Sequence, residues 1–133
     1  MRRAGRVLLD TNLVIALFAG ESAVARALAG TAEVLVPSIV VGELYYGAAC
    51  SRRPRANAER LRAFTAVSTV LPCDAVTAHF YGLLKAELRR QGTPIPENDL
   101  WIAALARQHE ALLATRDGHF RVVAGLSLDA WVE

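Results

Sequence analysis

A chain of 133 residues provides one domain with a sizeable hydrophobic core, which excludes a two-domain enzyme and removes any need for disulfides or metal merely to fold. The composition, 53% hydrophobic and 21% charged, excludes a disordered protein, and no apolar stretch is long enough to span a bilayer. The formal net charge of +2 is compatible with a nucleic-acid partner but does not single one out.

The N-terminal segment is predicted to form the first strand at residues 6–9 and a helix at 12–18 that ends before a glycine. Three arginines ahead of this apolar run imitate a signal peptide, but Asp10 interrupts the run. A signal peptide has no use for Asp-Thr-Asn at its apolar centre, so we expect these residues to belong to the mature domain. A helix at 22–28 and a strand at 33–36 follow.

The rest of the chain continues this alternation of short strands and helices. Pro37 and Ser38 open a helix, and Asp74 caps another that ends at Gly92. Residues 100–106 are apolar on every side, which predicts a helix buried in the core. In chain order, this part has helices at 39–49 and 54–67, a strand at 69–71, the helix between Asp74 and Gly92, the helix at 100–106, and strands at 112–114 and 126–128.

Strand–helix alternation predicts parallel pairing with right-handed crossovers, and therefore an α/β fold: a single three-layer α/β/α sandwich over residues 1–133 with a short parallel sheet. Functional sites of such sheets form at the carboxyl ends of the strands. The surplus of apolar residues indicates an interface with a second copy or a partner. Six aromatic residues at helical spacing are expected in the core: Tyr45, Tyr46, Phe64, Phe80, Tyr81 and Trp101.

The two cysteines, Cys50 and Cys73, lie far apart and form no C-x-x-C motif. This spacing predicts neither a zinc cluster nor a disulfide framework. Free thiols are usual in a reducing compartment, so we expect a cytoplasmic protein.

Four carboxylates stand in apolar surroundings. Asp10, Asp99 and Asp117 fall at predicted strand ends or helix starts, and Glu43 is the sole charge between Pro37 and Cys50. A buried ionised carboxylate needs a partner, and the sequence offers no lysine or arginine at suitable spacing for Asp10 or Glu43. A shared cation accounts for all four.

Oxygen ligands suit Mg²⁺ or Mn²⁺ rather than Zn²⁺, and none of the three histidines, His79, His109 and His119, shows ligand spacing. An ion held in this way activates water and stabilises charge on a phosphate oxygen, which fits phosphodiester hydrolysis. Thr115 precedes Asp117 by two residues and is a candidate to position a ligating oxygen or a metal-bound water.

Each acid alone also has a simpler explanation. Asp99 is a possible helix cap, Asp117 a turn residue before Gly118, and Asp10 part of a local turn. Glu43 has no capping role and no partner four residues away, so the four together favour a functional site. The five arginines of the basic patch, Arg52, Arg53, Arg55, Arg60 and Arg62, either contact phosphates or form a solvated helix face.

The acids lie in four short motifs that follow one another along residues 8–120. They are Leu8-Leu9-Asp10-Thr11-Asn12, Pro37-Ser38 through Glu43-Leu44, Asn98-Asp99-Leu100-Trp101-Ile102-Ala103-Ala104, and Thr115-Arg116-Asp117-Gly118-His119-Phe120. Together they resemble the motifs of PIN-domain ribonucleases, and more narrowly those of the VapC toxins of bacterial toxin–antitoxin pairs. Any one motif alone is weak, whereas all four in the family's order are specific.

This resemblance implies a metal-dependent endoribonuclease in which Asp10 and Asp99 are the main Mg²⁺ or Mn²⁺ ligands, and Asp117 and Glu43 bind directly or through water. It assigns supporting hydrogen bonds to Thr11, Asn12 and Thr115. It also implies a homodimer and a small VapB-like antitoxin that wraps the toxin and blocks its site. The arginine-rich segment is not a family motif, so RNA contact by Arg52, Arg53 and Arg55 is a separate hypothesis.

Other functions remain open at this stage. A structure-specific DNA nuclease uses the same acidic cluster, but it needs a helical arch or duplex-binding extension that one compact domain lacks. A PIN-like module that only binds a partner is a second alternative, which the four intact acids disfavour. A phospho-accepting receiver needs a lysine at a late strand end, whereas Lys85 is predicted in mid-helix, and a haloacid-type phosphatase needs a second aspartate where Asn12 stands.

Overall fold

The computed structural model describes residues 4–132, and at its centre is a parallel sheet of five strands in the order β3-β2-β1-β4-β5. The strands are β1 (Ala4–Leu9), β2 (Thr31–Pro37), β3 (Thr69–Leu71), β4 (Leu112–Ala114) and β5 (Leu128–Asp129). Val7 pairs with Val34 on one side and with Leu112 on the other, which fixes the register of the three central strands.

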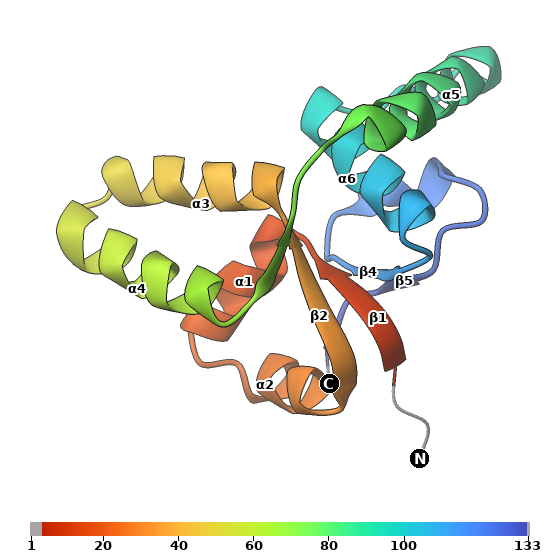
Figure 1. The fold of residues 1–133 in the computed structure, drawn as a ribbon. Helices are drawn as coiled ribbons and strands as arrows, with labels where there is room; N and C mark the ends of the chain where they lie inside the picture. The colour runs from red at the N-terminus through yellow and green to blue at the C-terminus, as the bar shows by residue number, and fades with distance from the viewer. Residues whose placement is uncertain (1–3, 133) are drawn as a thin grey trace.

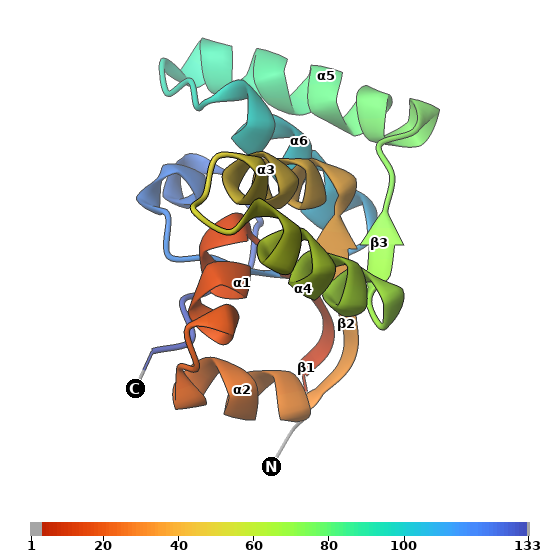
Figure 2. The same cartoon turned by 90° about the vertical axis from the view of Figure 1, so that its left-hand side faces the viewer.

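Helices cover both faces of the sheet (Figure 1). One layer contains α1 (Thr11–Phe18), α2 (Ser22–Ala29), α3 (Ser38–Ala49) and α4 (Pro54–Ala66), which Figure 2 shows from outside. The other layer contains α5 (Ala75–Gln91) and α6 (Glu97–Gln108). The two layers arise because right-handed crossovers toward β3 and back toward β4 pass on opposite faces.

The central strand β1 is apolar without alternation because both of its faces are covered. Val7, Leu8 and Leu9 are all fully buried. On the second face, α6 fills the space against the sheet with its own apolar run, in which Ile102 and Leu105 are fully buried. The predicted three-layer α/β/α sandwich with a short parallel sheet is therefore confirmed.

The structure differs from the predicted boundaries mainly around the loops. Helix α6 starts at Glu97 rather than at residue 100, directly after Pro96, which takes the cap position. Asp99 consequently lies inside the first helical turn and is not a cap. The last strand begins two residues later than predicted, and a short 3₁₀ helix, η1 (Gly118–Val122), was not predicted.

The expectation that the six aromatic residues lie in the core is wrong for Tyr46, which is 74% exposed, and for Tyr45, which is 36% exposed. The other four are only partly buried, and of these Phe64 and Tyr81 pack against the core. Tyr81 and Trp101 instead stack on one another between α5 and α6, with ring centroids 4.0 Å apart.

No single helix in the part of the chain that the structure describes is long and apolar enough to cross a membrane. Helices α1 and α2 meet the criteria of length and hydropathy only when taken together, and the chain bends by 110° between them.

The order of the strands places a topological switch point at the carboxyl ends of β1 and β4. The chain leaves β1 toward one helical layer and enters β4 from the other, which is the topological switch point of a doubly wound sheet. Asp10 directly follows β1 and Thr115 directly follows β4. The backbone N–H of Asp10 donates to the carbonyl of Ala114 at 3.0 Å, so the two strand ends are joined at this point.

Candidate active site

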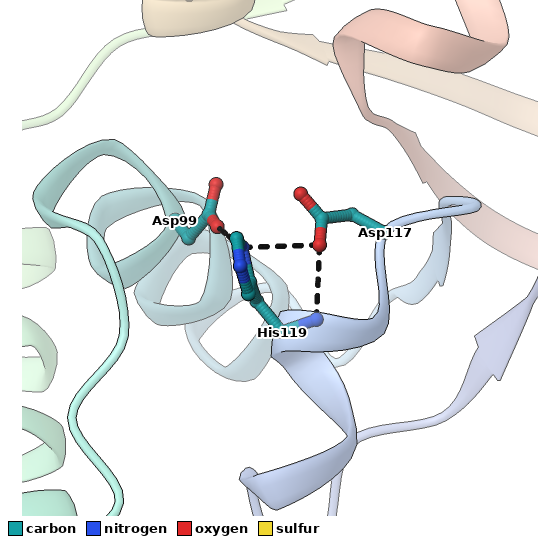
Figure 3. Close-up of side chains that lie close together, drawn as sticks. All are labelled: Asp99, Asp117 and His119. Carbon is teal, nitrogen blue, oxygen red and sulfur yellow. Dashed lines mark hydrogen bonds and ion pairs between the residues drawn. The ribbon is translucent and has the colours of Figure 1, made fainter.

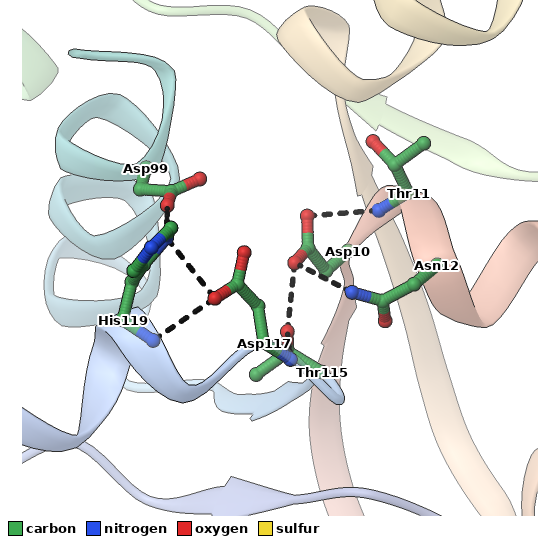
Figure 4. A network of polar contacts seen from close by, with 7 residues as sticks. All are labelled: Asp10, Thr11, Asn12, Asp99, Thr115, Asp117 and His119. Atoms are coloured by element: carbon green, nitrogen blue, oxygen red, sulfur yellow. Dashed lines mark hydrogen bonds and ion pairs between the residues drawn. The ribbon is translucent and has the colours of Figure 1, made fainter. Parts of the chain in front are cut away.

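Asp10 is a buried carboxylate, 5% exposed, whose two oxygens are both held by donors. Its Oδ1 accepts the backbone N–H of Thr11 at 2.8 Å, which caps α1. Its Oδ2 accepts the hydroxyl of Thr115 at 2.7 Å and the amide of Asn12 at 3.3 Å (Figure 4). The local turn therefore accounts for only part of the contacts of Asp10, because Thr115 binds it from a strand end 105 residues away.

Thr115 and Asn12 also hold the loop that follows β4. The Thr115 hydroxyl donates to Asp10 and at the same time accepts the backbone N–H of Asp117 at 3.0 Å. The side-chain oxygen of Asn12 accepts the backbone N–H of Arg116 at 3.1 Å. One hydroxyl therefore fixes the position of Asp117 relative to Asp10.

Asp99, Asp117 and His119 form a tight cluster (Figure 3), and Figure 4 shows this cluster beside Asp10. The Nδ1 atom of His119 lies 2.9 Å from Oδ2 of Asp99 and 3.0 Å from Oδ1 of Asp117. The same Asp117 oxygen accepts the backbone N–H of His119 at 2.9 Å. These three side chains offer ligand atoms that all lie within 4.8 Å of one another, which is close enough to share a metal ion.

His119, which shows no ligand spacing in the sequence, nevertheless lies within the cluster. Asp99 and His119 are separated by α6 and β4, so their contact depends on tertiary packing and leaves no sequence periodicity. The one local signal is the position of His119 between Asp117 and Phe120. Phe120 is fully buried and anchors the turn that carries the histidine.

Glu43 lies on α3, where its side chain is half-buried and the charges of Asp10 and Asp99 act on it. Burial raises its pKa, and the negative charges of Asp10 and Asp99 raise it further. Thr11 and Asn98 oppose this shift by favouring the charged form. Asn98 was not identified from the sequence.

The pKa of Asp99 is also raised, first by burial and then by the charges of Asp117 and Asp10, while the hydrogen bond to His119 lowers it. The pKa of His119 is raised in turn by its hydrogen bond to Asp99 and by the charge of Asp117. The four acids predicted from the sequence are thus brought together, and they repel one another. A bound cation would relieve this repulsion.

The chain matches the PIN-domain family model over residues 7–126. It belongs to the PIN-domain family. Among curated relatives, ribonuclease VapC2 of Haemophilus influenzae is 35% identical over 130 residues, which are 96% of this chain and 98% of the relative. The tRNA(fMet)-specific endonuclease VapC of Shigella flexneri is 32% identical over 95% of this chain and 98% of its own length.

Solved structures of toxin–antitoxin complexes have the same fold as this PIN domain. DNA-bound VapBC from Salmonella typhimurium matches with a TM-score of 0.87 and 28% identity, over 96% of this chain and 98% of that one. VapBC2 from Rickettsia felis, bound to a promoter DNA fragment, matches with a TM-score of 0.85 and 29% identity, over 93% and 97%.

A pocket of about 350 Å³ lies beside the acidic cluster of the PIN domain, between α1, α3 and α4. Thr11 and Glu43 belong to both the pocket and the cluster. The Oγ1 atom of Thr11 is buried, and its interaction with Glu43 favours the charged form of that carboxyl. The lining is mostly apolar and consists of Thr11, Ile15, Phe18, Glu43, Leu44, Gly47, Ala48, Asn57, Arg60 and Leu61.

The structure divides the arginine-rich segment into two groups. Arg60 lies over the ring of Phe18, 4.4 Å from its centroid, and donates to the Phe18 carbonyl at 2.7 Å. Arg62 pairs with Glu59 on the same helix. The remaining three, Arg52, Arg53 and Arg55, are exposed and form no ion pair with any residue between 4 and 132.

Arg116 is a further residue of the site loop that the sequence did not single out. Its guanidinium binds both carboxylate oxygens of Glu21, at 3.0 and 2.9 Å. It also donates to the carbonyls of Ala130 and Trp131, each at 3.0 Å. The loop that carries Asp117 is thereby tied to the start of α2 and to the segment after β5.

Proposed function

We propose that this PIN domain is a metal-dependent endoribonuclease and the toxin of a type II toxin–antitoxin pair. The observation that carries the proposal is the convergence of four carboxylates, Asp10, Glu43, Asp99 and Asp117, from separate segments at the switch point of the sheet. The curated VapC ribonucleases, which match nearly their whole length to this chain, support the same activity.

We propose Mg²⁺ or Mn²⁺ as the cofactor, with Asp10 and Asp99 as main ligands and with Asp117 and Glu43 binding directly or through water. The donor set fits such an ion, because it is rich in carboxylate oxygens, and burial together with their mutual repulsion raises the pKa of Glu43 and of Asp99. The buried hydroxyl of Thr11 beside Glu43 is a further oxygen available to a ligand or its water. The bound ion would supply an activated water and stabilise charge on the phosphate.

The surrounding side chains have a positioning role in this proposal. Thr115 and Asn12 fix the direction of the Asp10 carboxylate, and Thr115 also sets the backbone position of Asp117. Because these bonds exist before substrate arrives, the acids need little rearrangement to act on a phosphodiester. Arg52, Arg53 and Arg55, which lack ion pairs within the described chain, are proposed to contact RNA phosphates.

The partners proposed are RNA as substrate, a VapB-like antitoxin and a second copy of this chain, all in the cytoplasm. The apolar pocket next to Glu43 offers an anchor for an antitoxin side chain, and a peptide seated there would cover the acids. Exposed apolar side chains on α3 and α5, among them Tyr46 at 74% and Leu83 at 59%, support a homodimer.

The test is incubation of purified, antitoxin-free protein with total cellular RNA in Mg²⁺, in Mn²⁺ and in EDTA. We expect discrete products that need the metal and that fall by about 100-fold or more in Asp10→Asn and in Asp99→Asn. Asp129→Asn is the matched control, because Asp129 is an exposed aspartate at the end of β5, outside the cluster.

Circular dichroism must show that the inactive variants remain folded. Cleavage that persists in both folded variants would refute the assignment of the acids. Cleavage of DNA in a parallel digestion, with RNA left intact, would favour the structure-specific DNA nuclease instead.

A further inference from the structure

We propose that His119 is itself a ligand of the metal centre, and that its nitrogen makes the site prefer first-row transition ions over Mg²⁺. The inference rests on the metal centre of the proposed function, and it adds a nitrogen donor to what was otherwise an all-oxygen site. If His119 binds the ion, the preference of the site for Mn²⁺ over Mg²⁺ depends on this one side chain.

The first argument is geometric. Around an octahedral ion with bonds of about 2.1 Å, neighbouring donor atoms lie about 3.0 Å apart. The Nδ1 atom of His119 is 2.9 Å from Oδ2 of Asp99 and 3.0 Å from Oδ1 of Asp117. The nitrogen is therefore spaced from each carboxylate oxygen as a neighbouring donor on one ion would be, and the three ligand atoms all lie within 4.8 Å of one another.

The second argument concerns which parts of the cluster are fixed. The backbone N–H of His119 is bound to Asp117, and the next residue, Phe120, is fully buried, so the backbone here is anchored. The imidazole is 54% exposed and can adjust about its side-chain torsions. Within the described chain, the other oxygen of each carboxylate, Oδ1 of Asp99 and Oδ2 of Asp117, accepts no hydrogen bond, so each acid has a second oxygen for the ion besides the one beside Nδ1.

The third argument is the chemistry of the donor. Mg²⁺ takes oxygen ligands almost exclusively, whereas an imidazole nitrogen binds first-row ions with an affinity that rises from Mn²⁺ to Co²⁺. A histidine ligand should therefore contribute most to Co²⁺ binding, less to Mn²⁺ binding and least to Mg²⁺ binding. A histidine that only holds Asp99 and Asp117 in place should affect all three ions alike.

The first experiment is pulsed electron paramagnetic resonance of Mn²⁺ bound to protein labelled with ¹⁵N-histidine, without RNA. We expect a coupling from directly bound nitrogen in the wild type and in His79→Gln, and no such coupling in His119→Gln. His79 is a suitable control because it is an exposed histidine on α5. Mn²⁺ that binds the wild type without nitrogen coupling would overturn the inference and leave the proposed nuclease standing.

The second experiment is calorimetric titration of the same variants with Co²⁺, Mn²⁺ and Mg²⁺. His119→Gln should weaken Co²⁺ binding by about 10-fold or more, Mn²⁺ binding by less, and Mg²⁺ binding hardly at all. An equal loss for all three ions would assign His119 a positioning role and refute ligation. Failure of every ion to bind the wild type would refute the metal centre, and with it both this inference and the proposed function.

Discussion

The Thr115 hydroxyl donates to one catalytic candidate, Asp10, and accepts from the backbone of another, Asp117. Thr115→Val keeps the shape of the side chain and removes both bonds, so we expect a loss of about 1–3 kcal/mol in the free energy of unfolding, together with a clear fall in RNA cleavage. Urea unfolding and a cleavage assay on the same preparation measure the two effects.

Thr31→Val is the matched control for this change. Thr31 is also buried, and its hydroxyl donates to the carbonyl of Ala27 at 2.8 Å, at the opposite end of the sheet. We expect a comparable loss of stability and no loss of cleavage. Equal cleavage by the two variants would show that Thr115 serves the fold alone.

Glu43 should destabilise the metal-free protein at neutral pH. Its pKa is raised by burial and by Asp10, so the folded state holds its proton more tightly than the unfolded state does. The penalty is absent below the ordinary value of 4.5 and grows as pH rises through the folded value. In EDTA, Glu43→Gln should therefore melt above the wild type at pH 7, with the difference vanishing near pH 4.

Glu59→Gln, on the exposed side of α4, is the control for this comparison. A Glu43→Gln variant that melts below the wild type at pH 7 would show that Glu43 is paired rather than repelled. Thermal melts followed by circular dichroism are sufficient.

Single residues were predictable to different degrees for physical reasons. Charged side chains inside apolar segments stand out in a sequence because they need a partner, and Asp10 and Glu43 were found in this way. His119 stands in a polar turn where a histidine is unremarkable. Its role arises only when α6 packs against the sheet and brings Asp99 to it.

Among the elements, α5 depends on a capping box at its first turn. Asp74 accepts the backbone N–H of Thr77 at 3.0 Å, and its own backbone N–H donates to the Thr77 hydroxyl at 3.1 Å. The backbone N–H of Thr77, and after it the Thr77 hydroxyl, lower the pKa of Asp74, so its charge stabilises the fold above the ordinary value of 3.8. That stabilisation is lost as pH falls through the lowered folded value.

Asp74→Asn retains an acceptor without a charge, so it should melt below the wild type at pH 7 and approach it as the pH drops under 3.8. Asp74→Ala should melt below both at pH 7, because it loses the cap altogether. A melting difference between wild type and Asp74→Asn that does not change with pH would contradict the role of the charge.

The elements themselves were largely predictable, since apolar runs and caps are local signals. Asp74 caps the start of α5, and the left-handed Gly92, with φ of 73°, ends it, as the sequence predicts. The start of α6 and the position of β5 were not predicted correctly. Pro96 sets the start of α6, and the pairing with β4 sets the position of β5. The exposure of Tyr46 depends on what packs against α3, which helical spacing does not reveal.

For the whole molecule, the proposed homodimer makes a direct prediction. Sedimentation equilibrium should give twice the chain mass of 14.4 kDa. Tyr46→Ser should raise the dissociation constant by about 30-fold, since a buried aromatic anchor is typically worth 2 kcal/mol or more at an interface. Val67→Ser removes an even more exposed apolar side chain, 87% exposed and just after α4, and should leave the mass unchanged.

A monomeric wild type would refute the homodimer, but it would not contradict the proposed nuclease activity. The layered architecture and the parallel pairing were predictable, since alternating strands and helices admit few arrangements once crossovers are right-handed, whereas the order of the strands was not predicted. The switch point between β1 and β4, and hence the place where the acids meet, is a consequence of that order.

The double role of Asp10 has a consequence for how toxicity can be lost. Its carboxylate caps α1 and binds Thr115, so replacements other than asparagine should weaken the fold as well as the chemistry. Asp99 caps nothing, and its loss removes a charge from a crowded cluster. Some cells will escape this toxin through a point mutation that leaves the protein folded and still able to bind the antitoxin. In such cells we expect changes at Asp99 more often than at Asp10.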